Sequence, residues 1–264
     1  MPQQYHDSPQ TYFDWVRQCA VSFDWLNVMC YDYHGAFDDP AKGTGVNAPL
    51  LQDSTLNGPY SVKNTVEAYL KAGIAKDKIV IGMPTYGRSF SLAAPPIAPT
   101  NGYGQPFTAA GPAGAATGVP GVLAYYEILA QLESGELTAA WDDATLTPYA
   151  YSRSGNTWAS YDDPESLAYK VSYVIERGLG GAMIWSIDDD AFSAATAFPL
   201  VRAVKGILDN PATRPALPTA AVDADAQALA NAIKNNQSLG NARTRRCLCC
   251  FSSAAQRTSI PQPS

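Results

Sequence analysis

The segment IVIGMP at Ile79–Pro84 is an unbroken run without a polar side chain. A short apolar run between turn signals is typical of a strand covered on both faces, as in a parallel sheet. Two further runs have a similar character, WLNVMCY at 25–31 and GAMIWS at 181–186. The sequence therefore predicts three short strands buried in a parallel sheet.

Helical patterns alternate with these strands. Apolar residues recur at helical spacing from about 9 to 19, 61 to 73, 163 to 178 and 198 to 208. Ser61 and Asp163 stand where N-caps belong, and Gly178 stands where a helix of this length would end. Strand and helix units in sequence predict a right-handed parallel α/β layout, whose reactive side chains gather at the carboxyl ends of the strands.

Two segments differ in composition from this pattern. Residues 89–160 are rich in Pro, Gly, Ala and Tyr, with one helical pattern at 123–132 and a hairpin-like stretch at 149–158. This segment is expected to form an inserted α+β subdomain within an ordered part spanning 1–208. Residues 209–264 offer little apolar surface beyond one short helix predicted at 223–234, so they are expected to be a linker and a disordered tail.

Composition excludes several classes of function. The 264 residues carry 18 basic and 24 acidic side chains, a net charge of −6, so nucleic acid is not an expected partner. No apolar stretch reaches the roughly 18 to 20 residues of a membrane span, and residues 1–10 lack a signal-peptide pattern. Five cysteines without paired spacing predict neither a disulfide framework nor a metal site, and no cofactor is expected. The 15 tyrosines and five tryptophans suggest a stacking surface.

Candidate site residues follow the three strands. They are Met29, Tyr31 and Asp32 after the first, Met83, Tyr86 and Arg88 after the second, and Met183, Trp185 and Asp188 after the third. Aromatic faces, hydrogen-bond donors and little net charge suit a sugar ring. Each aromatic residue alone is more often part of a core, so only their joint placement favours a site. Asp32 could instead cap a turn, and Asp188–Asp190 could be a solvated acidic loop rather than a metal site.

The strand segments carry a family resemblance. FDWLNVMCYDYHG at 23–35, IGMPTYGRSF at 81–90 and GGAMIWSID at 180–188 resemble the sixth, seventh and eighth strands of family 18 glycoside hydrolases, the chitinases. Residues 89–160 are similar to the insertion domain of the deep-cleft members. The resemblance implies a (β/α)8 TIM barrel, which here would be incomplete. The family's D-x-x-D-x-D-x-E motif, which carries the catalytic acid, does not occur in these 264 residues.

The resemblance also implies substrates and residue roles. Family members hydrolyse β-1,4-linked N-acetylglucosamine polymers by a substrate-assisted retaining mechanism, and they are usually secreted. Tyr31 and Asp32 would be the catalytic residues, with Tyr31 donating a hydrogen bond to the acetamido oxygen. Trp185 would be the floor on which the sugar stacks. The other substrate-binding residues would be Met29, Met83, Tyr86, Arg88 and Met183.

Chitin or chito-oligosaccharides are therefore the expected partners. General acid catalysis contributes about 10² to 10⁴ in rate, so this chain alone is expected to have little or no activity. Two alternatives remain open. One is a chitin-binding, lectin-like protein without catalysis, and the other is a truncated gene product without independent function.

Overall fold

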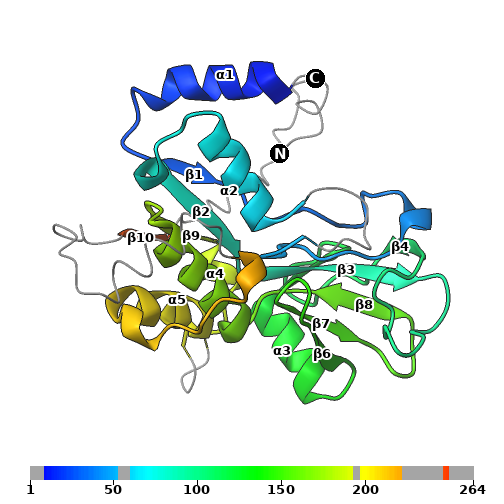
Figure 1. Cartoon of the computed structure of the whole chain (residues 1–264). Helices are drawn as coiled ribbons and strands as arrows, with labels where there is room; N and C mark the ends of the chain where they lie inside the picture. Colours follow the sequence, from blue (N-terminus) through cyan, green and yellow to red (C-terminus); the bar gives the residue numbers. More distant parts are fainter. Residues whose placement is uncertain (1–8, 53–59, 193–196, 222–245, 250–264) are drawn as a thin grey trace, which may run out of the picture.

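Two sheets make up the fold (Figure 1). The computed structural model describes residues 9–52, 60–192, 197–221 and 246–249. One sheet has four parallel strands in the order β1-β2-β9-β10. The other has six antiparallel strands in the order β4-β3-β8-β7-β6, with β5 paired to β3.

The parallel sheet contains the three predicted strands. β1 (Leu26–Val28) pairs with β2 (Ile79–Pro84), which pairs with β9 (Gly181–Trp185). All six residues of β2 are buried, as the apolar run predicts for a strand covered on both faces. The predicted parallel α/β arrangement is confirmed for these strands.

Helices cover the parallel sheet at the predicted positions. They are α1 (Pro9–Ala20), α2 (Val62–Lys71), α4 (Pro164–Arg177) and α5 (Pro199–Asp209). The Ser61 hydroxyl accepts a hydrogen bond from the Asn64 N–H and so caps α2. Asp163 caps α4 in the same way, and Gly178 ends α4 in the left-handed conformation. Figure 1 shows α4 and α5 packed side by side near β9.

The antiparallel sheet continues directly from β2. Its strands are β3 (Tyr86–Leu92), β4 (Phe107–Ala110), β5 (Val122–Ala124), β6 (Thr138–Asp142), β7 (Thr147–Tyr151) and β8 (Thr157–Ser160), with α3 (Tyr125–Glu133) after β5. β7 and β8 form the predicted hairpin. Only Thr85 separates the end of β2 from the start of β3. Trp158 and Phe90 are fully buried in this sheet's own core.

A long connection, the strap (residues 33–50), joins the end of β1 to the antiparallel sheet. It contains the short helix η2 (Pro40–Lys42). The Thr44 N–H donates to the Gln105 carbonyl at 3.0 Å, and the Leu50 N–H donates to the Thr145 carbonyl at 3.1 Å. The strap thereby ties the loop after β1 to segments more than 60 residues later in the chain.

The tail differs from expectation. Residues 246–249 were expected to be disordered, but they form β10 (Arg246–Cys249), which pairs in parallel with β9. An edge strand presents unpaired backbone N–H and C=O groups, and even a polar segment can satisfy them. Two short helices, η5 (Pro211–Thr213) and η6 (Thr219–Ala221), precede β10. The helix predicted at 223–234 lies outside the described residues. Among those residues, no helix is both long enough and apolar enough to cross a bilayer.

Candidate functional site

Side chains from the ends of β1 and β9 meet the start of β3 above the parallel sheet. Tyr31, Tyr86 and Met183 are buried together in one apolar cluster. The Tyr31 and Tyr86 rings meet edge to face, with centroids 6.1 Å apart. Gly82 leaves room for them, because a Cβ at this position would lie 2.7 Å from Tyr31 Cε1 and 3.1 Å from Met183 Cε. The predicted convergence of these residues is thus observed.

Asp32 is held by two residues of β3. The Tyr86 hydroxyl donates to Asp32 Oδ1 at 2.7 Å, and Arg88 Nε donates to the same oxygen at 2.8 Å. The second guanidinium nitrogen of Arg88 lies 2.7 Å from this oxygen and completes an ion pair. Burial and the nearby Asp32 charge raise the pKa of Tyr86 well above its ordinary value, so its hydroxyl stays protonated and remains a donor.

Trp185 at the end of β9 and Met29 just after β1 are both exposed. Residues alternate between faces along a strand, so Trp185 shares the face of Met183, two residues earlier on β9. Its side chain is 41% exposed, whereas Met183 is only 3% exposed. The Trp185 ring is therefore not fully buried in the core, and its exposed part is available for stacking on a ligand. Met29 is 52% exposed.

The prediction for Met83 is wrong, because the structure places it in the larger core. It is fully buried and belongs to the cluster that includes Ile81 and Ile184. The strand register pairs Gly82 with Met183 and Met83 with Ile184. Because neighbouring residues of a strand face opposite sides, Met83 lies on the face away from Tyr31 and Met183.

The acidic side chains of the loop after β9 accept hydrogen bonds from nearby residues. Asp190 accepts hydrogen bonds from the backbone N–H groups of Leu200 and Val201 in the first turn of α5. Asp188 and Asp189 both accept from the Ser186 hydroxyl. Asp188, one of the strand-end candidates, is therefore bound within its own loop.

Two further residues were not predicted. The Phe37 ring lies 5.6 Å from the Arg88 guanidinium and is 62% exposed. The sequence feature that could have indicated Phe37 is its place as a single aromatic residue within the polar stretch HGAFDD at 34–39. Asn47 of the strap contacts the backbone of both Asp32 and Tyr86. Nothing in the local sequence marks it.

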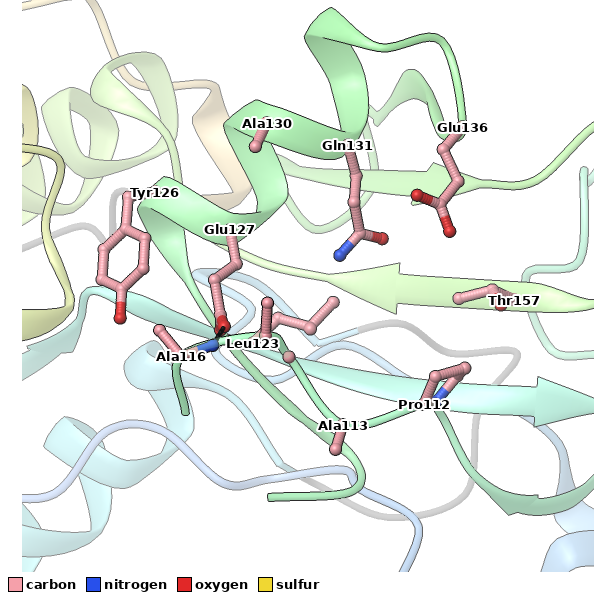
Figure 2. A pocket seen from close by; sticks show the side chains of 12 residues that line it. Pro112, Ala113, Ala116, Leu123, Tyr126, Glu127, Ala130, Gln131, Glu136 and Thr157 are labelled. Atoms are coloured by element: carbon pink, nitrogen blue, oxygen red, sulfur yellow. Dashed lines mark hydrogen bonds between the residues drawn. The ribbon is translucent and has the colours of Figure 1, made fainter. Parts of the chain in front are cut away.

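A separate cavity of about 440 Å³ lies beside α3 (Figure 2). Its wall includes Tyr126, Glu127 and Gln131 of α3 and the loop 112–116. Glu127 accepts from the N–H groups of Ala116 at 2.7 Å and Ala124 at 2.9 Å, and from the Thr117 hydroxyl at 2.9 Å. Glu127 therefore holds the loop against α3.

Glu127→Gln tests this loop anchor. Desolvation raises the pKa of Glu127, but hydrogen bonds from Ala116, Ala124 and Thr117 together outweigh it and hold the pKa below its ordinary value. A carboxyl group whose pKa is lower in the folded than in the unfolded state stabilises the protein when the pH is above its unfolded-state pKa. This stabilisation is lost as the pH falls through the folded-state pKa. We expect Glu127→Gln to lower the free energy of unfolding by about 2 kcal/mol at pH 7 and by less in acid.

Urea denaturation at a series of pH values measures this difference. The exposed Glu133 of the same helix gives the control variant Glu133→Gln, for which we expect little change. An equal loss for Glu127→Gln at pH 7 and in acid would contradict the role of the charge.

Relatives of this chain are chitinases and chitinase-like proteins. The chain is 40% identical over 202 residues to chitinase-3-like protein 2 of Homo sapiens, an alignment covering 74% of this chain and 50% of that protein. It is 37% identical over 210 residues to chitotriosidase-1 of Mus musculus, covering 77% and 42% respectively. The chain thus spans about half the length of these curated relatives.

A solved structure has a similar fold. Human YKL-39, described as a pseudo-chitinase with retained chitooligosaccharide binding properties, superimposes with a TM-score of 0.67 at 39% identity. This likeness covers 74% of the present chain and 53% of YKL-39. Residues 1–190 match the family model for glycosyl hydrolases family 18. With that match over most of its length and its strand ends converging as the resemblance implies, the chain belongs to glycosyl hydrolases family 18.

Proposed function

We propose that this chain forms the saccharide-binding part of a family 18 active site and binds chito-oligosaccharides. The observation that carries the proposal is the polar and aromatic cluster of Tyr31, Asp32, Tyr86 and Arg88 next to the half-exposed Trp185 ring. Such a surface offers a stacking face and oriented donors with little net charge, which suits a neutral sugar. The chitooligosaccharide binding of YKL-39 supports the same substrate class.

Each residue has a defined part in this proposal. Trp185 stacks on the sugar, and Tyr31 donates a hydrogen bond to the oxygen of its acetamido group. In a substrate-assisted reaction this oxygen attacks the anomeric carbon, so the protein must orient the group and supply a proton to the leaving oxygen. Asp32, held by Tyr86 and Arg88, contacts the sugar near its glycosidic bond. Met29 and Met183 shape the wall.

We further propose that the parallel sheet is part of a (β/α)8 barrel, with β1, β2 and β9 as its sixth to eighth strands. Residues 89–160 are the inserted subdomain, and residues 209–264 follow the catalytic part. The acid motif D-x-x-D-x-D-x-E does not occur in the 264 residues. Glu127 is engaged in anchoring its loop, and Glu67 pairs with Arg177. We therefore propose that this chain binds oligosaccharides without cleaving them.

Replacing Trp185 by Ala tests the binding proposal. We expect the affinity for N-acetylglucosamine oligomers, measured by isothermal titration calorimetry, to fall about tenfold because the stacking face is lost. Trp15→Ala is the control, since Trp15 is 62% exposed on α1, and we expect no change in affinity. Chromatography of the same mixtures should show no shorter products. Absence of binding by the unmodified chain, or equal binding by Trp185→Ala, would refute the proposal.

A further inference from the structure

We propose that Asn47 is a positioning residue for the saccharide site and that it acts through Asp32. The inference rests on the proposed function for its effect on binding. Asn47 lies in the strap, 15 residues after Asp32 and 39 before Tyr86. No side chain of the strap was predicted to take part in the site.

Asn47 joins the backbones of two site residues. Its Oδ1 accepts a hydrogen bond from the Asp32 N–H at 2.9 Å, and its Nδ2 donates to the Tyr86 carbonyl at 3.2 Å. The side chains of these same residues are joined by the bond from the Tyr86 hydroxyl to Asp32 Oδ1. Asn47 thus sets the spacing of the two backbones that this side-chain hydrogen bond requires.

Asp32 needs such a support. Its φ is +60°, in the left-handed region that non-glycine residues rarely adopt. An unfavourable backbone conformation persists only where the surroundings hold it in place. The hydrogen bond from the Asp32 N–H to Asn47 is one such restraint, and it acts on the residue whose carboxylate faces Tyr86 and Arg88.

Asn47 is itself held firmly. It is fully buried, its own N–H donates to Ser160 Oγ at 2.8 Å, and its carbonyl accepts from the Tyr33 N–H at 3.0 Å. Its neighbour Ala48 packs in the cluster with Tyr31. A carboxamide supplies both the acceptor and the donor that this place uses, whereas Asp lacks the donor and Leu lacks both.

Binding measurements with two Asn47 variants and one control test the inference. We expect Asn47→Leu to weaken binding of N-acetylglucosamine oligomers about tenfold in folded protein, and Asn47→Asp about threefold. Thr44→Val is the control, because Thr44 is also fully buried in the strap and its hydroxyl bonds to Gly102 and Gly104, away from Asp32. This control should lose thermal stability and keep its affinity within twofold.

A double-variant cycle separates positioning from general damage. In an Asp32→Ala background, Asn47→Leu should still lower stability but should cause no further loss of affinity, because its effect passes through Asp32. An undiminished affinity loss in that background would overturn the inference.

Hydrogen exchange at the Asp32 amide, followed by NMR without saccharide, gives an independent readout. We expect exchange to be at least tenfold faster in Asn47→Leu, and close to that of the unmodified chain in Asn47→Asp, which keeps the acceptor. If Trp185→Ala weakens binding as expected while Asn47→Leu changes neither affinity nor exchange, the inference fails and the proposed function stands. If the unmodified chain binds no saccharide but exchange accelerates as expected, the proposed function fails and the positioning of Asp32 by Asn47 stands.

Discussion

Lys170→Met is expected to lower the free energy of unfolding by about 3 to 5 kcal/mol, a large part of the total stability of an ordinary domain. Lys170 forms an ion pair with Asp162, and both side chains are only 1% exposed. The substitution leaves a carboxylate in the core with the Ser166 hydroxyl as its remaining donor. Burial lowers the pKa of Lys170 and the charge on Asp162 opposes this, so the ammonium group depends on its partner.

Two further variants make this prediction specific. Lys205→Met removes an ion pair with Asp209 whose side chains are more than 60% exposed, and we expect it to cost about 0.5 kcal/mol or less. The double variant Lys170→Met, Asp162→Leu should recover most of the loss, because no unpaired charge remains. Urea denaturation midpoints measure all three. A loss for Lys170→Met no greater than that for Lys205→Met would refute the role of the buried pair.

The buried pair also acts on Cys30, a thiol of the larger core. The Lys170 charge acts on the Cys30 thiol, and Cys30 precedes Tyr31 in the chain. Burial raises the pKa of Cys30 to about 12, so the thiol stays protonated. Cys30 is fully buried in the apolar core, as a small hydrophobic residue would be.

Gly43→Ala is expected to cost about 3 kcal/mol or more. Gly43 has φ 87° and ψ 177°, a region essentially confined to glycine, where other residues are strained by about 1 to 3 kcal/mol. An added Cβ would also lie 2.2 Å from the Gly104 carbonyl oxygen, a backbone atom that cannot rotate away. Overpacking of this kind typically costs about 1 to 3 kcal/mol. The strap would have to move, and Asn47 with it, so saccharide affinity should fall as well.

Gly135→Ala is the matched control for this substitution. Gly135 has φ 77°, but an added Cβ there would meet no atom within 4 Å. We expect a loss of about 1 kcal/mol from backbone strain alone, with no change in saccharide affinity. Thermal denaturation and calorimetric titration of both variants measure the difference. Equal losses of stability would show that the contact with Gly104 is unimportant.

Local patterns in the sequence predicted the three parallel strands β1, β2 and β9 and the helix caps, and they named most of the candidate residues that the structure brings together. The apolar run of β2 and the caps Ser61 and Asp163 depend on residues a few positions apart, which is why they could be read directly. The candidate residues at the strand ends followed from the parallel layout. The resemblance to family 18 then suggested the substrate class and the residue roles that we propose.

The sequence by itself determined that this is a parallel α/β chain of family 18 with aromatic and polar residues at its strand ends. Only the tertiary structure decided which of them meet. The strand register places the Met83 side chain in the core. Tyr86 and Arg88 of β3 bond to Asp32, although more than 50 residues separate them from it in the sequence. Asn47 of the strap bonds to the backbone of Asp32, and β10 pairs with β9 at the edge of the parallel sheet. These contacts depend on which backbones lie side by side after folding, and no local periodicity encodes them.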